Sequence, residues 1–112
     1  MRTPPTHGLS RYSRDAAVLL GQLIRTARIE RRLTTVELAE RVGISRGLVQ
    51  RIERGDPGCA IGRVFECAAI VGVPLFDLDR PGLEDAVAAG RRTLTLMPKA
   101  VRARRDGDDD DF

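Results

Sequence analysis

Residues 37–55 read ELAERVGISRGLVQRIERG and have the pattern of two short helices separated by a turn. The residues before Gly43 have the apolar spacing of an amphipathic helix, and similar spacing resumes two residues after it. Glycine ends a helix readily because it adopts the left-handed conformation without a steric penalty. Ser45 is placed to cap the second helix, whose inward residues are Leu48, Val49 and Ile52. The stretch therefore predicts a helix-turn-helix, in which one face of the second helix stays free for the DNA major groove.

The flanking sequence predicts further helices and an all-α fold. A helix over about 15–32 places a set of side chains at three- and four-residue spacings: Val18, Leu19, Gln22, Leu23, Thr26, Ala27 and Ile29. Thr34 and Glu37 have the spacing of a capping box before a helix over about 35–42, which buries Val36, Leu38, Ala39 and Val42. A helix over about 60–71 presents Ile61, Val64, Phe65, Ala68, Ala69 and Val71. We expect a bundle of four to five helices, in which the small Ala39 lets the helices of the motif approach closely.

Composition limits the classes of protein. A chain of 112 residues has room for one small domain, and the 4% aromatic content requires an aliphatic core. Cys59, Cys67 and the single histidine, His7, have neither zinc-ligand nor disulfide-framework spacing, so we expect free, buried thiols and no metal or other cofactor. The sequence contains no phosphate-binding loop and no nucleophile paired with a base, so we do not expect an enzyme. No apolar run approaches the roughly 18 to 20 residues of a membrane span, and a cytoplasmic protein is expected.

Charge is distributed unevenly along the chain. Five of the sixteen acidic residues lie in the last seven positions, DGDDDDF, so residues 1–105 carry 19 basic and 11 acidic side chains, a balance of +8. Most of the basic residues are arginines, whose planar fork suits phosphates and guanine edges. Composition is therefore compatible with nucleic-acid binding and does not prove it.

The sequence LTTVELAERVGISRGLVQRIERG, followed by FECAAIVGVPLFDL, resembles the Cro/C1-type (XRE family) helix-turn-helix transcriptional regulators over about residues 18–78. The resemblance implies a Cro/C1-like, lambda repressor-like bundle that binds double-stranded DNA. It also implies base-reading roles for Arg46, Gly47, Gln50 and Arg51, on the outward face of the second helix of the motif. Gly47 departs from the polar residue usual in the family, so fewer bases are read directly.

The same resemblance implies a phosphate-contacting position at Thr35, where the family usually has the longer glutamine. We expect Ser45, at the start of the reading helix, and Arg54, beside the turn that follows it, to contact phosphates as well. Glu53 is assigned a structural role, facing Arg25 or Arg28 on the preceding long helix.

The chain outside this domain predicts three further segments. Residues 1–14 have no period and are expected to form a flexible arm before the domain at 15–78. Residues 79–97 predict a short helix and then a strand, because Thr93, Leu94, Thr95 and Leu96 alternate with period two. An isolated strand is not stable, so it either packs on its own domain or pairs with its copy in a homodimer, which we favour. Residues 98–112 form a charged tail that we expect to be disordered.

The tail suggests a protein partner. A Cro-like domain followed by such a tail resembles HipB-like antitoxins, which are encoded beside HipA-like kinase toxins. The expected partner-binding residues are Asp108, Asp109, Asp110, Asp111 and Phe112. Three hypotheses remain open: an autorepressing antitoxin of a HipBA-like toxin-antitoxin system, a stand-alone repressor, and a mainly protein-binding module. The acidic tail can also act as a brake on non-specific DNA binding, since five aspartates repel phosphate.

Overall fold

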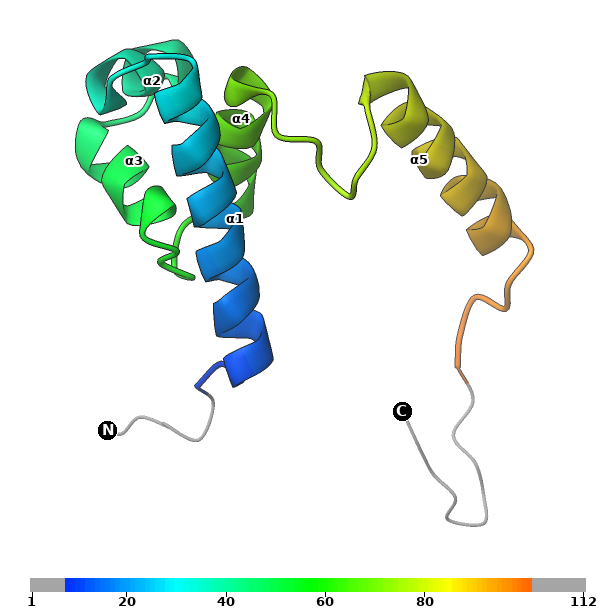
Figure 1. The fold of residues 1–112 in the computed structure, drawn as a ribbon. Helices are drawn as coiled ribbons and strands as arrows, with labels where there is room; N and C mark the ends of the chain where they lie inside the picture. Colours follow the sequence, from blue (N-terminus) through cyan, green and yellow to red (C-terminus); the bar gives the residue numbers. More distant parts are fainter. Residues whose placement is uncertain (1–7, 102–112) are drawn as a thin grey trace. The chain divides into compact units, whose positions relative to one another are not determined.

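A computed structural model describes residues 8–101, and every regular element in that range is a helix. The elements are α1 (Arg11–Glu30), α2 (Thr35–Val42), α3 (Arg46–Glu53), α4 (Ile61–Val71) and α5 (Arg80–Thr95), shown in Figure 1. The chain divides into two compact units, Met1–Asp77 and Leu78–Phe112. The first unit contains α1 to α4 and the second contains α5. The predicted all-α bundle is confirmed.

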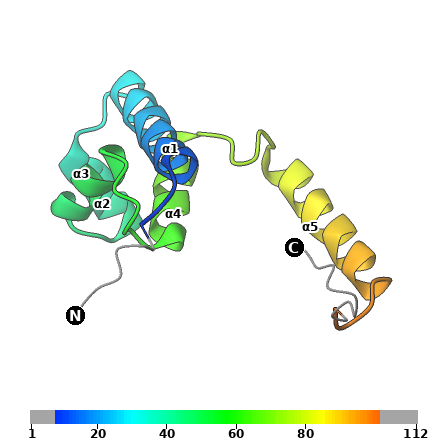
Figure 2. The same cartoon turned by 90° about the horizontal axis from the view of Figure 1, so that it is seen from below.

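The helices of the first unit pack around one small aliphatic core. Helix α1 lies against α3 and α4, and α2 lies against the same two helices, as the two views in Figures 1 and 2 show. The core consists of Ile24, Leu38, Ala39, Val49, Ile52, Cys67, Ala68 and Val71. Both cysteines are free, and Cys67 is buried while Cys59 is half-buried.

Helix α1 differs from the prediction in its start and in its buried face. It begins at Arg11, where the hydroxyl of Ser10 accepts a hydrogen bond from the amide of Ser13, so residues 11–14 belong to a helix and not to an arm. Its fully buried aliphatic side chain is Ile24, whereas Leu19 and Leu23 lie about half exposed. The predicted buried face was therefore displaced around the helix from the observed one. Apolar residues occur on more than one face of α1, and the side that faces the core includes Gly21 and Arg28, which an apolar pattern does not mark.

Gly21 lies where α1 passes closest to the end of α3. A Cβ atom at this position would lie 2.5 Å from the carbonyl oxygen of Ile52 and 2.8 Å from that of Glu53. Both neighbours are backbone atoms, which cannot rotate away as a side chain would. The absence of a side chain at Gly21 therefore lets α1 support the backbone of α3 directly.

The predicted C-terminal strand is wrong, because its residues extend α5 to Thr95. Asp79 caps this helix by accepting a hydrogen bond from the amide of Gly82 at 2.8 Å. The hydroxyls of Thr93 and Thr95 donate to the carbonyls of Ala89 and Arg91, at 3.1 and 2.9 Å. A threonine hydroxyl that donates to the carbonyl four residues earlier has its hydrogen bond inside the helix. The alternation of threonine and leucine is therefore compatible with a helix as well as with a strand.

Candidate nucleic-acid interface

The corner between α2 and α3 forms as the sequence predicted. Thr34 and Glu37 complete a capping box, with hydrogen bonds of 2.8 and 3.0 Å. Gly43 ends α2 in the left-handed conformation, with φ of 83°, and its amide donates to the carbonyl of Ala39. The hydroxyl of Ser45 accepts from the amide of Leu48 and starts α3. Local capping therefore fixes where α2 begins and ends and where α3 begins.

Helix α3 has one buried face and one exposed face. Val49, Ile52 and Glu53 are buried against the other helices, and they hold the helix in place. The predicted base-reading residues Arg46, Gly47 and Arg51 are exposed, and Gln50 is half-buried. The exposed face thus contributes little to the core, and its side chains are available to a partner.

Glu53 connects the buried face of α3 to α1 through an ion pair. Its carboxylate accepts from Nε of Arg28 at 2.6 Å and from Nη2 at 3.0 Å, while Nη1 of Arg28 donates to the carbonyl of Leu33 at 2.8 Å. The hydrogen bond to Glu53, the largest effect, raises the pKa of Arg28 above its ordinary value. Of the two predicted partners of Glu53, the structure selects Arg28. Its pairing with Glu53 fixes α3 on α1.

A polar groove of about 410 Å³ opens beside this exposed face. It is lined by Arg25, Arg28, Thr35, Arg46, Gln50, Glu53 and Arg54. Within it Nε of Arg46 donates to the hydroxyl oxygen of Thr35 at 3.3 Å. The groove therefore brings together two predicted base readers and two predicted phosphate contacts, contributed by α2, α3 and the residue that ends α3.

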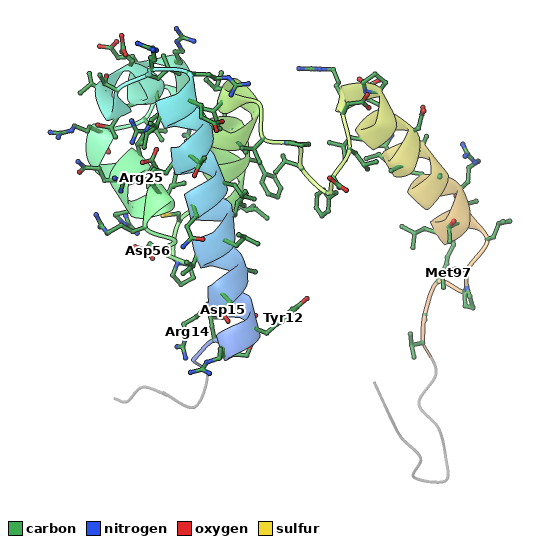
Figure 3. All side chains as sticks on the ribbon, in the orientation of Figure 1. Tyr12, Arg14, Asp15, Arg25, Asp56 and Met97 are labelled. Carbon is green, nitrogen blue, oxygen red and sulfur yellow. The ribbon has the colours of Figure 1, made fainter. Side chains whose placement is uncertain are left out.

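Arg25 is a member of the groove that was not predicted as a DNA contact. It lies on α1, next to α3, as Figure 3 shows. Its position one turn before Arg28 is the signal that could have indicated it, since residues three apart share a helix face. Sequence alone treated Arg25 and Arg28 as alternatives for one role. The structure gives Arg28 to the ion pair and leaves Arg25 at the groove.

Arg51 is held outside this groove by Asp56, which lies in the turn after α3 (Figure 3). Nε of Arg51 donates to Oδ2 of Asp56 at 2.9 Å, and the amide of Gly58 donates to Oδ1 at 2.8 Å. The hydrogen bond from Gly58, and then the one from Arg51, lower the pKa of Asp56 below its ordinary value. The carboxylate therefore stays ionised and keeps its hold on Arg51 well into the acidic range.

Three predictions concern the tail, metal binding and membrane spans. The proposed partner-binding residues Asp108–Asp111 and Phe112 lie outside the described residues. Within residues 8–101, no group of three or more His, Cys, Asp or Glu side chains is arranged to hold a metal ion. No helix in the same range is long and apolar enough to cross a membrane.

Two short helices meeting at a glycine corner, with an arginine-rich outer face, define a helix-turn-helix, a class of DNA-binding regulator domain. A family model described as a helix-turn-helix domain matches residues 19–80, which is more than half of the chain. The protein belongs to this helix-turn-helix family. No curated protein and no solved structure matches the chain.

Proposed function

We propose that the protein is a sequence-specific transcriptional regulator of the Cro/C1 type, which reads an operator with α3. The observation that carries this proposal is the division of α3 into a face fixed to the core and an exposed face beside a groove lined by Arg25, Arg46 and Arg54. Arg46 and Arg51 suit O6 and N7 of guanine, and Gln50 suits an adenine edge.

Thr35, Ser45 and Arg54 are the proposed phosphate contacts. The hydroxyl of Thr35 accepts a hydrogen bond from Arg46, and that of Ser45 accepts from the amide of Leu48, so each keeps its own O–H to donate. Phosphate contacts fix the register of a domain on the duplex without reading its sequence. These short side chains at the starts of α2 and α3 therefore orient the reading helix over the groove.

The proposed DNA-bound form is a homodimer on a two-fold symmetric operator. Each chain supplies one reading helix, and one helix contacts only a few base pairs. The half-sites are then separated by about one helical turn, roughly 34 Å, or by a multiple of it. A monomer that protects a single half-site at micromolar concentration would contradict this arrangement.

The biological role that we favour is that of an autorepressing antitoxin, with the acidic tail binding a basic partner such as a HipA-like kinase toxin. This hypothesis rests on the sequence resemblance alone; a stand-alone repressor and a mainly protein-binding module are the alternatives. Deleting residues 106–112 distinguishes a partner-binding tail from a brake. Loss of partner binding with unchanged operator affinity supports the first role, and stronger binding to random DNA supports the second.

The experiment that tests DNA reading compares Arg46→Ala with Arg54→Ala on a selected operator and on random DNA. Arg46→Ala should cost about 1 to 3 kcal/mol on the operator and relax the preference at one base pair. Arg54→Ala should weaken both DNAs alike and lower the salt slope by about one unit. The proposed reading face is refuted if Arg46→Ala affects both DNAs equally.

A further inference from the structure

Helix α5 carries an apolar stripe that its own unit does not bury. No residue of α5 is buried, and the exposed fractions are 47% for Val87, 70% for Leu94 and 54% for Met97, just beyond the helix end. With Leu83 and Gly90 these residues recur at alternating spacings of four and three. This is the a/d pattern of a coiled coil, with Leu83, Gly90 and Met97 at d and Val87 and Leu94 at a. A stripe of this kind fits the matching stripe of another helix.

No contact within 4 Å among the described residues explains the glycine at position 90. A Cβ at this position would meet nothing within 4 Å, and a glycine in a helix interior destabilises it by about 0.5–1 kcal/mol relative to alanine. A small residue in the middle of a stripe lets another helix approach closely. Placing Gly90 opposite Val87 of an antiparallel copy also aligns Leu83 with Leu94, so that each layer pairs a d position with an a position.

The charges beside the stripe select the antiparallel orientation. Glu84 and Arg91 occupy successive e positions, and flanking positions of this kind set partner choice and orientation. In an antiparallel pair the e positions of the two helices face each other, so that Glu84 of each copy lies near Arg91 of the other. In a parallel pair Glu84 instead faces Asp79 of the other copy, the capping residue just before the helix, and Arg91 faces Ala86, so neither charge has an opposite partner.

We propose that α5 is a homodimerisation helix, which pairs antiparallel with α5 of a second copy through the stripe and two Glu84–Arg91 ion pairs. This inference deepens the proposed function by naming the surface that makes the regulator dimeric. It replaces the predicted strand pairing, since those residues are helical. Dimerisation does not depend on DNA, and so it can be measured without an operator.

The test is a charge exchange in the full chain, measured by sedimentation equilibrium. Glu84→Arg and Arg91→Glu should each weaken the dimer about tenfold, because each converts two attractions into two repulsions. The double variant restores both pairs and should return to within about twofold of the original dimer. Asp85→Arg is the matched control, since Asp85 is at an f position on the far side of the helix, and it should change little.

Four results would overturn this proposal. They are a monomer at about 100 µM, unchanged dimers in both single variants, a double variant weaker than either single variant, and a stronger dimer in Glu84→Arg. The last result would indicate a parallel pair, because the substitution removes the repulsion from Asp79. The proposed DNA reading fails separately, if no DNA sequence is preferred by the dimeric protein.

A second observation, independent of α5, concerns how Asp56 holds Arg51. The amide of Asp56 donates to the carbonyl of Arg51 at 3.1 Å, which fixes the turn next to the helix end. The carboxylate is bound on one oxygen by the amide of Gly58 and on the other by Nε of Arg51. The arginine side chain, itself 46% exposed, is thus bound to a carboxylate that cannot turn freely.

Within residues 8–101 no hydrogen bond engages the two terminal nitrogens of Arg51, so they can face a partner. Arginine reads guanine through two parallel hydrogen bonds to O6 and N7, and a pre-oriented fork loses less entropy on binding. We infer that Asp56 is a positioning residue, which aims Arg51 end-on at one guanine. The inference rests on the proposed function, since it requires that Arg51 reads a base.

The test is Asp56→Ala, with binding measured on the operator, on its single-base variants and on random DNA. Operator affinity should fall about tenfold and the preference at the Arg51 base pair should flatten, while affinity for random DNA stays equal or rises because a negative charge is removed. In an Arg51→Ala background the same substitution should cause no further loss of operator affinity or base preference. Glu66→Gln, which removes one exposed charge from α4, is the matched control and should leave the base preference unchanged.

The inference is overturned if Asp56→Ala keeps the full base preference, or if it weakens operator and random DNA equally. Failure of the proposed function is recognised differently, because the unsubstituted protein would then show no base preference at any position. A lower unfolding midpoint for Asp56→Ala would identify a folding defect. In that case Asp56→Asn, which keeps the acceptor for the Gly58 amide, is used instead, with the same measurements and criteria.

Discussion

Removing Glu53 should destabilise the domain more than the loss of its contact area suggests. Glu53→Ala leaves the guanidinium of Arg28 buried, with only the hydrogen bond to the carbonyl of Leu33 remaining. The side chains of the pair are 11% and 5% exposed, so both charged groups are largely shielded from water in the folded protein. Breaking a buried pair from one side typically costs about 3–5 kcal/mol. We expect about 3 kcal/mol, the lower end, because both residues also line the polar groove and the site can hydrate.

Thermal and urea unfolding, followed by circular dichroism, measure this loss. For a domain of this size about 3 kcal/mol corresponds to a fall in Tm of roughly 12–24 °C, at about 4–8 °C per kcal/mol. Arg28→Met combined with Glu53→Leu should recover most of the stability, since an apolar pair leaves no buried charge. Arg51→Ala, which breaks an exposed ion pair, is the control and should move the midpoint little.

The reasoning is refuted if each single substitution costs under about 1 kcal/mol and the effects of the two add in the double variant. Additivity would mean that Arg28 and Glu53 do not act as a pair. The raised pKa of Arg28 implies that this stabilisation is present below the arginine's unfolded-state pKa and is lost only in strong alkali. The pair should therefore contribute equally across the neutral range, which a comparison of variants at pH 6 and pH 9 checks.

Two further predictions concern packing and thiol chemistry. Gly21→Ala should destabilise the domain by about 1–3 kcal/mol, because its Cβ would press on the backbone of α3, whereas Gly62→Ala meets nothing and should be neutral or stabilising in the same denaturation assay. Burial raises the pKa of Cys67 to about 11, so iodoacetamide at pH 8 should alkylate the half-buried Cys59 first, and mass spectrometry after proteolysis identifies the order. Equal alkylation rates, or an unchanged midpoint for Gly21→Ala, would contradict these expectations.

The sequence predicted the motif well because local chemistry determines it. The capping box at Thr34, the left-handed Gly43 and the cap at Ser45 depend on residues within four positions of one another, and all three are observed. The packing of α1 was predicted less well, because the choice of buried face depends on where α3 and α4 lie. Gly21 is the clearest case, since its role exists only where another backbone approaches.

In the candidate site, too, features set by nearby residues were predicted better than features set by the tertiary structure. The resemblance to the Cro/C1-type regulators placed Arg46 and Gln50 together on α3, and both line the groove, Arg46 exposed and Gln50 half-buried. The hold of Asp56 on Arg51 was missed because it depends on the conformation of a turn rather than on periodicity. In α5 the alternation of threonines suggested a strand, although the heptad spacing of its apolar residues is the stronger signal over that length.

The separation of the two faces of α3 also bears on how specificity could be altered. Residues that face the core hold the helix in place, and the fully exposed Arg46 and Gly47 contribute little to that packing. Substitutions at Arg46 or Gly47 can therefore alter the target sequence with little effect on folding. Gly47 offers room for a side chain, because a Cβ built there lies 3.9 Å from the Ser45 hydroxyl, an ordinary van der Waals distance. A library randomised at this position alone would add side chains to a part of the exposed face that now has none. Such a library could yield variants with different operator specificities.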